Sequence, residues 1–368
     1  MNILHIPPYA PPIEGGSERF CFNLCKKLIS LGHSARVLSS IKTGTRFNVI
    51  EGVPCFFRKN YWQMLGLNPL SFIYQDLRQG VDWADIVHVH SYIYFLGNQV
   101  ALYRRKRRFP FILHLHGGTS PITSDVYGPG AAIVKKIYDA TVGKWVIQTA
   151  DMILTSSRDD ATNAINRFGA NPDRVIPIPN SIYVDDFYSA PQNPLIVTFM
   201  ARLTQLKGCY LIPDIIKRVY QERKDVQFWI VGEGHVESFM RKELEGLPVK
   251  FWGMVPQSQV PDIFAKSSVS FLPSYTESCP LAILESLASS VPVVASNVGG
   301  VPEIITDGET GFLTQVEDTK TMAEKIIFLL DNDDTRVSMG RRGRKFVVKH
   351  HSWSETVLKI EKIYEAMI

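Results

Sequence analysis

Two glutamates around the start of a predicted helix are the residues of this chain best suited to chemistry. In SYTESCPLAILESL, Glu277 stands just before the helix and Glu285 follows eight positions later within it. Pro280 suits the first helical turn, where the amides lack intrahelical partners. Those amides, at residues 278–282, and the helix dipole predict a diphosphate site. Carboxylates there would repel phosphate unless they accept hydrogen bonds from sugar hydroxyls; the alternative is a capping carboxylate plus a solvated helix glutamate.

Two cations follow another predicted strand, at residues 195–200. Arg202 and Lys207 occur in FMARLTQLKGC, where the end of a strand would hold them in place. Cations in fixed positions stabilise the negative charge that grows on a departing nucleoside diphosphate. A commonplace pair of surface cations is the alternative.

The N-terminal half offers paired glycines and strand-end histidines. Gly15 and Gly16 lie in PPIEGGSERF between a predicted strand and a predicted helix. Glycines there let the backbone approach a ligand, and the next helix offers unpaired amides, although a tight structural turn explains the glycines equally well. His114 and His116 close an apolar strand in HLHGG, a position at which a histidine is most often structural.

The wider segment around the glutamates has a specific resemblance. Glu277, seven intervening residues and Glu285, followed by PVVAS, GGVPEII and DGETGFL, resemble the donor-site signature of retaining GT-B glycosyltransferases. That family includes sucrose-phosphate, lipopolysaccharide and phosphatidylinositol sugar transferases. The resemblance spans nearly the whole chain, is strongest over residues 198–313, and is weak over residues 43–82, where acceptor determinants tend to lie in this family.

The resemblance implies roles for particular residues. Glu277 would orient the donor sugar, Glu285 would bind ribose, and Arg202 with Lys207 would stabilise the leaving diphosphate. The catalytic residues that it implies are Glu277, His116, Arg202 and Lys207. The donor-binding residues that it implies are Gly15, Gly16, Arg202, Lys207, Gly253, Val255, Glu277, Ser278, Cys279, Leu281, Ala282 and Glu285.

The order of elements predicts an α/β fold with two Rossmann-like domains. Apolar runs at residues 2–6, 35–38, 86–90, 111–116, 152–155 and 175–177 alternate with amphipathic stretches, and a second series begins at 195–200. A chain of 368 residues also favours two domains. With the GT-B resemblance, we expect an acceptor-side domain over 1–190, a donor domain over 195–350, facing each other, and a terminal helix over 352–368 that packs back on the first domain.

Composition limits the other partners. The net charge of +4 does not by itself indicate nucleic acid, and the chain lacks an apolar run of membrane-spanning length and a signal peptide, so we expect a cytoplasmic protein. Five cysteines without CxxC spacing predict buried free thiols and no structural zinc site. The basic run YRRKRR, from Tyr103 to Arg108, is typical of a solvated helix end; peripheral contact with an anionic membrane is the alternative.

The expected activity is metal-independent transfer of a sugar, with retention, from a nucleoside-diphosphate sugar to a glycan, glycolipid or small-molecule acceptor. UDP-sugar is slightly favoured over GDP-sugar, and no cofactor is required, because Arg, Lys and helix dipoles replace a divalent cation. A dehydrogenase is disfavoured by the lack of a strand-linked GxGxxG with an acid about 20 residues on. A GT-B epimerase or phosphorylase and a non-catalytic sugar-nucleotide-binding protein remain alternatives.

Overall fold

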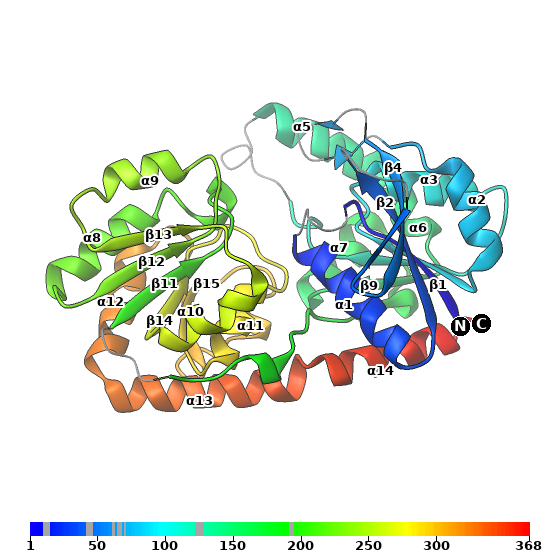
Figure 1. The fold of residues 1–368 in the computed structure, drawn as a ribbon. Helices are drawn as coiled ribbons and strands as arrows, with labels where there is room; N and C mark the ends of the chain where they lie inside the picture. The colour runs from blue at the N-terminus through cyan, green and yellow to red at the C-terminus, as the bar shows by residue number, and fades with distance from the viewer. Residues whose placement is uncertain are drawn as a thin grey trace. The chain divides into compact units, whose positions relative to one another are not determined.

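The computed structural model describes residues 1–9, 15–41, 47–60, 63–64, 68–69, 71–121, 129–190 and 195–368. The described chain forms two compact units (Figure 1). Unit 1 comprises Met1–Asn180 together with Trp353–Ile368, and unit 2 comprises Ser181–Ser352. Residues 191–194 of the expected linker, and parts of the weakly matching stretch at 43–82, lie outside the described residues.

Unit 1 is built on a sheet with the strand order β10-β9-β8-β7-β1-β2-β4-β3 among the described residues. Its neighbouring strands are parallel except for β3 and β4. The strands are β1 (Asn2–Ile6), β2 (Ser34–Ile41), β3 (Phe47–Ile50), β4 (Val53–Lys59), β7 (Ile86–His90), β8 (Phe111–Leu115), β9 (Met152–Thr155) and β10 (Val175–Pro177). Two short strands, β5 (Gln63–Met64) and β6 (Asn68–Pro69), pair separately.

The central strands of unit 1 are almost continuously buried because helices cover the parallel sheet. These helices are α1 (Gly16–Ser30), α2 (Tyr74–Trp83), α3 (Phe95–Arg104), α5 (Pro129–Tyr138), α6 (Lys144–Thr149), α7 (Arg158–Phe168) and the terminal α14 (Trp353–Glu365). The ring of Trp353 in α14 lies 5.0 Å from that of Phe20 in α1, and Glu361 Oε1 lies 2.6 Å from His33 Nε2. The end of the chain is thus part of unit 1.

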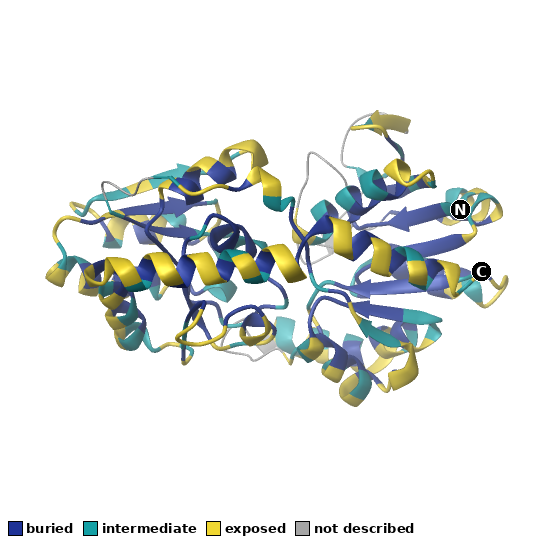
Figure 2. Ribbon diagram, turned by 90° about the horizontal axis from the view of Figure 1, so that it is seen from below, coloured by how far each residue is buried: buried dark blue, intermediate teal, exposed yellow. Residues whose placement is uncertain are grey.

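Unit 2 has a parallel sheet with the order β13-β12-β11-β14-β15-β16. Its strands are β11 (Ile196–Met200), β12 (Gln227–Val231), β13 (Val249–Gly253), β14 (Val269–Leu272), β15 (Val293–Ser296) and β16 (Gly311–Thr314). Its helices are α8 (Ile212–Glu222), α9 (Glu237–Glu243), α10 (Val260–Lys266), α11 (Leu281–Ala288), α12 (Thr319–Asp331) and α13 (Asp333–His350). Figure 2 shows buried strands and helices whose outer faces are exposed.

Both sheets confirm the predicted parallel α/β architecture, and both reverse their strand order once. In unit 1 the reversal lies between β1 and β7, and in unit 2 between β11 and β14. Ligands of open α/β sheets bind beyond the carboxyl ends of the strands at such a reversal. The residues that follow these four strands are therefore the first place to look for a site. Among the described residues, no helix combines the length and the apolar character needed to cross a membrane.

Candidate functional site

The strand reversal of unit 2 brings two predicted residues into direct contact. Lys207 follows β11 and Glu277 follows β14, and Lys207 Nζ donates to Glu277 Oε1 at 2.6 Å. Ser274 Oγ donates to the same oxygen at 2.7 Å. Glu277 is only 9% exposed, so these donors compensate for the loss of water around the carboxylate. Its other oxygen, Oε2, accepts no hydrogen bond from the described residues, which leaves that oxygen for a ligand.

Two glycines fix the backbone around this contact. Gly208 has φ +70°, and a Cβ there would lie 1.9 Å from the carbonyl oxygen of Pro273. Gly299 has φ +49°, and a Cβ there would lie 1.9 Å from the carbonyl oxygen of Glu277. That oxygen also accepts a hydrogen bond from Gly300 at 3.1 Å. Any side chain at either position would push the loop that carries Glu277 away from its neighbour.

The turn between Glu277 and α11 has the form expected from the sequence. Pro280 is the N-cap, and the helix begins at Leu281. Among the residues assigned to the diphosphate, Ser278, Leu281 and Ala282 are half-buried, whereas Cys279 is buried. The start of α11 thus lies beside the Lys207–Glu277 pair and remains partly exposed, as binding of an anion at a helix start requires.

Glu285 lies deeper than expected for a residue that binds ribose. It is 2% exposed, and its Oε1 accepts a hydrogen bond from Gln257 Nε2 at 3.1 Å. Gln257 itself is exposed. A ribose hydroxyl that replaced this amide would satisfy the same carboxylate oxygen.

The loop after β13 is held by a glutamate from the turn after β12. Gly253 ends β13, and the N–H of Met254 donates to Glu233 Oε1 at 3.1 Å. Val255 is half-buried beyond it. Glu233 lies in VGEGH, the turn after β12, so that turn fixes the loop that carries the predicted donor-binding residues Gly253 and Val255.

Arg202 differs from Lys207 in having no internal partner. It is exposed in the loop after β11, and its guanidinium makes no ion pair or hydrogen bond with the described residues. A cation held at a strand end without a carboxylate partner is available to an anionic ligand.

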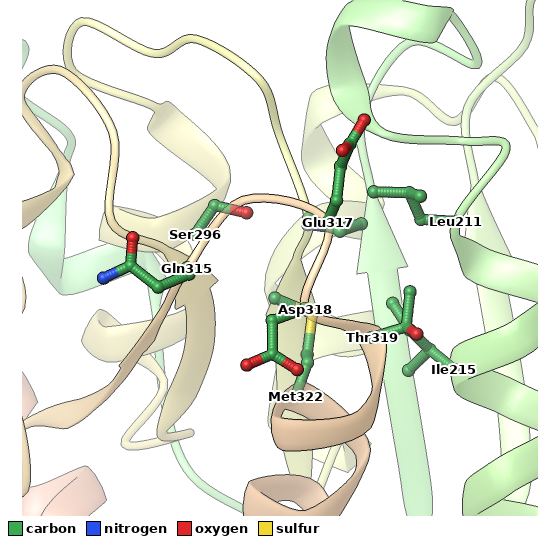
Figure 3. Close-up of a pocket in the computed structure, with 9 residues that line it drawn as sticks. Leu211, Ile215, Ser296, Gln315, Glu317, Asp318, Thr319 and Met322 are labelled. Carbon is green, nitrogen blue, oxygen red and sulfur yellow. The ribbon is translucent and has the colours of Figure 1, made fainter.

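A shallow pocket of unit 2 lies beside this site, between α8 and the segment that joins β16 to α12 (Figure 3). Its rim is acidic, but its carboxylates are engaged: Glu317 accepts a hydrogen bond from Tyr275 Oη at 2.8 Å, and Asp318 caps α12 through the N–H of Thr321. The pocket is lined by Leu211, Ile215, Pro273, Ser296, Gln315, Glu317, Asp318, Thr319 and Met322. This acidic rim is unsuited to a diphosphate.

His116, the remaining predicted catalytic residue, belongs to unit 1. Its Nε2 lies 3.0 Å from His90 Nδ1, and its Nδ1 lies 3.4 Å from Ser156 Oγ. Burial lowers the pKa of His116 to about 3, so the ring is neutral at neutral pH. A neutral imidazole with a neighbour at each nitrogen is suited to hydrogen bonding rather than to carrying a proton.

Gly15 and Gly16 also belong to unit 1, at the start of α1. The N–H of Gly15 donates to Glu18 Oε2 at 3.0 Å, and Ser17 Oγ donates to the same oxygen at 2.8 Å. A carboxylate at a helix start satisfies the local positive potential. The amide of Gly15, the N-cap residue, is therefore satisfied, whereas the unpaired amides expected from the sequence are those of the helix that follows it.

The sequence did not single out three residues that contact the predicted ones. Ser274 stands three positions before Glu277, and Glu233 lies between two glycines at a strand end, so a positional signal existed for both. Gln257 lies in a segment without a motif and is linked to Glu285 by the tertiary structure alone.

Two family models match this chain, one on each half. Residues 185–346 match the family described as Glycosyl transferases group 1, and residues 14–186 match Glycosyltransferase Family 4. The chain is 25% identical over 376 residues to the phosphatidylinositol N-acetylglucosaminyltransferase gpi3 subunit of Schizosaccharomyces pombe, covering 97% of this chain and 78% of that protein. It is 27% identical over 377 residues to an uncharacterized glycosyltransferase of Methanocaldococcus jannaschii, covering 100% and 99% of the two chains.

Solved structures show the same fold. Sucrose-phosphate synthase from Thermosynechococcus elongatus has a TM-score of 0.83 at 18% identity, with coverage of 99% of this chain and 98% of that one. Anabaena HepE in complex with UDP and glucose has a TM-score of 0.79 at 18% identity, with complete coverage of both chains. The two models thus identify a Glycosyltransferase Family 4 region over residues 14–186 and a Glycosyl transferases group 1 region over residues 185–346, and the solved structures show that the chain has the GT-B fold.

Proposed function

We propose that this protein transfers a sugar from a nucleoside-diphosphate sugar to an acceptor hydroxyl, with retention of anomeric configuration and without a divalent cation at the donor. The observation that carries the proposal is the Lys207–Glu277 contact at the strand reversal of unit 2. Three groups lie together beyond the carboxyl ends of the strands: an ammonium, a carboxylate and the start of a helix. The ammonium and the helix start suit a diphosphate, and the carboxylate suits the hydroxyls of a sugar. The glycosyltransferase relatives support turnover rather than binding alone.

The cations would act on the leaving group. Arg202 has no carboxylate partner in the described part of the chain, so its full charge is available to the diphosphate. Lys207 already donates one hydrogen bond to Glu277, but its ammonium has three N–H donors and can bind a phosphate oxygen as well. Negative charge on the diphosphate grows as the glycosidic bond breaks, so both contacts strengthen toward the transition state. The start of α11 would add backbone donors without a metal.

Glu277 would act on the sugar. Lys207 and Ser274 hold Oε1, which leaves Oε2 to accept a sugar hydroxyl and to support positive charge developing at the anomeric carbon. We favour front-face displacement: the acceptor oxygen bonds to the anomeric carbon, the bond from that carbon to the phosphate oxygen breaks, and the acceptor proton passes to the leaving phosphate. The products are the glycoside and the nucleoside diphosphate.

The nucleotide would lie between the β13 loop and Glu285. Glu233 fixes Gly253 and Val255 for the base, and Glu285 binds ribose in place of the Gln257 amide. Structures of the fold relative HepE with UDP and with UDP-glucose support a UDP-sugar as the first donor to test. The resemblance also assigns His116 and Gly16 of unit 1 to donor contact.

The relatives also suggest which acceptors to test first. They include phosphatidylinositol N-acetylglucosaminyltransferases and D-inositol 3-phosphate glycosyltransferases, at 23–26% identity. Both names contain an inositol phosphate, so a panel of glycan, glycolipid and small-molecule acceptors should begin with inositol phosphates.

The test is to incubate the protein with labelled UDP- and GDP-sugars, with and without acceptors, and to follow nucleotide release, product and anomeric configuration. Acceptor-dependent release with a retained anomer supports the proposal. Conversion of the donor without an acceptor would indicate an epimerase, phosphate-dependent release would indicate a phosphorylase, and binding without turnover would indicate a sensor. An inverted product would remove the retaining mechanism.

Contact with an anionic membrane remains a separate proposal for the basic run after α3. Arg104 pairs with Asp151, and Arg107 pairs with Asp82, so two of its five cations are engaged within unit 1. Arg105, Lys106 and Arg108 are exposed. Sedimentation with vesicles of anionic lipid, but not with neutral ones, is the expected result; equal binding to both would remove this proposal.

A further inference from the structure

A cluster of buried histidines occupies the carboxyl ends of the central strands in unit 1. Five of the nine histidines of the chain belong to it, four of them within strands and the fifth one residue beyond β8. The register places His5 beside His88, and His90 beside His114. The histidine cluster comprises His5, His88, His90, His114 and His116. It thus lies at the strand reversal between β1 and β7, the position that suits a ligand in this sheet type.

The hydrogen bonds of this cluster are incomplete. The four histidines within strands are at most 1% exposed. Among their buried ring nitrogens, His5 Nε2, His88 Nε2 and both nitrogens of His114 have no hydrogen-bond partner in the described part of the chain. A buried polar atom without a partner destabilises a fold by about 1–3 kcal/mol, so the cluster is costly to the fold, but these four nitrogens are not the ones through which His5 and His90 face each other.

Helix α1 brings a thiol to this cluster. One ring nitrogen each from His5 and His90, with the Sγ of Cys21, lie within 4.8 Å of one another, and all three residues are fully or almost fully buried. His5 Nδ1 and His90 Nε2 are 3.1 Å apart. Two imidazole nitrogens around a tetrahedral zinc ion with bonds of about 2.0–2.1 Å lie roughly 3.3 Å apart. The observed separation therefore suits two zinc ligands as well as it suits a hydrogen bond.

We propose that unit 1 binds a zinc ion between α1, β1 and β7, with His5, His90 and Cys21 as ligands. Cys25 lies one helical turn after Cys21 on the same face of α1 and is also fully buried. It interacts with both Cys21 and His5, but its Sγ is not in the group of atoms that lie within 4.8 Å of one another, so the thiol would turn toward the ion to become the fourth ligand. Two imidazoles and two thiolates form a common structural zinc set. No CxxC motif was required, because the fold supplies the remaining ligands from strands.

Charge favours this site over a second triad in the same cluster. His88, His90 and His114 also have ring nitrogens within 4.8 Å of one another. Three neutral imidazoles would leave the full charge of a divalent cation uncompensated in an apolar core, whereas two thiolates neutralise it. Zinc binding would release the thiol protons.

The zinc site would also orient His116. If His90 binds zinc through Nε2, its Nδ1 carries hydrogen and donates to His116 Nε2, 3.0 Å away. His116 Nδ1 then carries its hydrogen and faces Ser156 Oγ. Ligating histidines usually donate their other N–H in this way, which fixes ring orientation and tautomer. The zinc ion would thus bind His90, and His90 contacts His116, the predicted catalytic histidine.

The experiment is metal analysis of untagged protein purified without added metal, followed by cobalt substitution. We expect about one zinc ion per chain, and cobalt-loaded protein should show a thiolate-to-cobalt charge-transfer band with visible bands of tetrahedral cobalt. Cys21→Ser should lose the charge-transfer intensity from one thiolate and bind zinc at least tenfold more weakly. Cys55→Ser is the matched control, because Cys55 is equally buried in the same unit but is not among the ligands.

Several outcomes would overturn the proposal. The proposal is wrong if the folded wild-type protein contains no zinc and binds none when zinc is added. That result would be enough by itself, regardless of the results for the variants. A cobalt spectrum without a thiolate band, with metal lost in His114→Leu and retained in Cys21→Ser, would assign the metal to the histidine triad instead. Equal loss in Cys21→Ser and Cys55→Ser would show that binding follows stability. Circular dichroism of each variant separates loss of metal from loss of fold.

Discussion

The two units share a strand order but place their polar groups differently around the strand reversal. In unit 2, Lys207 and Glu277 lie in loops beyond β11 and β14, where they pair with each other; Glu277 is buried and Lys207 remains partly exposed. In unit 1, His5, His88 and His90 lie within the strands and are fully or almost fully buried. Loop groups can exchange an internal partner for a ligand, whereas strand groups cannot reach solvent without disturbing the sheet.

Because of this difference, we expect substitutions in the loops of unit 2 to change catalysis and substitutions in the strands of unit 1 to change stability. Removing a loop group of unit 2 should change the reaction and leave the fold, because the sheet core of that unit is formed by apolar side chains. Removing a buried polar partner in unit 1 should change the free energy of unfolding, because the remaining partner stays buried without a hydrogen bond. The predictions below test each side of this comparison.

The largest expected effect is that of Glu277→Ala. Loss of the carboxylate should lower the rate constant for transfer by roughly a thousandfold, because the developing positive charge and the sugar orientation lose their partner. The free energy of unfolding should change little. Steady-state kinetics and urea unfolding provide the measurements. Glu243→Ala is the matched control, since it removes an exposed lysine–glutamate pair with Lys217 in the same unit; equal losses in both variants would contradict the assignment.

The two cations come next. Arg202→Ala or Lys207→Ala should lower turnover by on the order of a hundredfold, because the diphosphate gains charge in the transition state. Lys207→Arg should not restore it, because a planar guanidinium does not reproduce an ammonium that contacts both Glu277 and phosphate. Kinetics with varied donor at saturating acceptor test this. A rise in the Michaelis constant alone would mean that the cations bind only the ground state. Arg218→Ala, which breaks an exposed pair, is the control.

In unit 1 the expected effect is on stability. Tyr364→Phe removes the hydroxyl that lies 2.6 Å from His88 Nδ1 and leaves another buried ring nitrogen without a partner. The free energy of unfolding should fall by about 2 kcal/mol. Tyr188→Phe in unit 2 is the control, because its hydroxyl bonds Asp262 at the surface and its loss should have little effect. Denaturant unfolding gives both values; equal effects would remove the distinction between the units.

A smaller effect on binding is expected at Glu285. Glu285→Ala should weaken binding of the bare nucleoside diphosphate about tenfold, or about 1.4 kcal/mol, because a ribose hydroxyl loses its acceptor. Gln257→Ala should leave affinity unchanged or raise it, since this amide occupies the same oxygen. Calorimetric titration with UDP and GDP tests both variants. Glu277→Ala should affect binding of the bare nucleotide less than Glu285→Ala, and the reverse order would exchange their assigned roles.

The smallest effect is expected from chelation. Brief treatment with excess EDTA should leave transfer unchanged, because cations and helix amides replace a metal at the donor. A zinc ion in unit 1 would be too deeply buried to be removed on that timescale, so zinc content should also persist. If EDTA abolishes activity and manganese or magnesium restores it, transfer is not metal-independent. A slow loss of zinc, accompanied by a loss of stability, would bear only on the zinc site proposed in unit 1.

The amino-acid sequence was sufficient to predict the helices and strands and to single out the charged residues in the loops that follow the strands. Apolar runs bounded by turn residues located the strands to within a few positions, because burial in a parallel sheet demands such runs. Glu277, Arg202 and Lys207 could be singled out because they stand next to strand ends or a helix start, and local position predicts their surroundings. The terminal helix was evident from its apolar spacing, and the structure places it in unit 1.

What the tertiary structure alone decided is which side chains meet. The sequence could not pair Glu285 with Gln257, or place Glu18 on the amide of Gly15, because side-chain rotation decides such contacts. Nor could it bring Cys21 to His5 and His90, since these residues come from a helix and two strands that are separate in the chain. Cysteine spacing reports sites built within one segment, whereas sheet register and helix packing assemble sites from several segments.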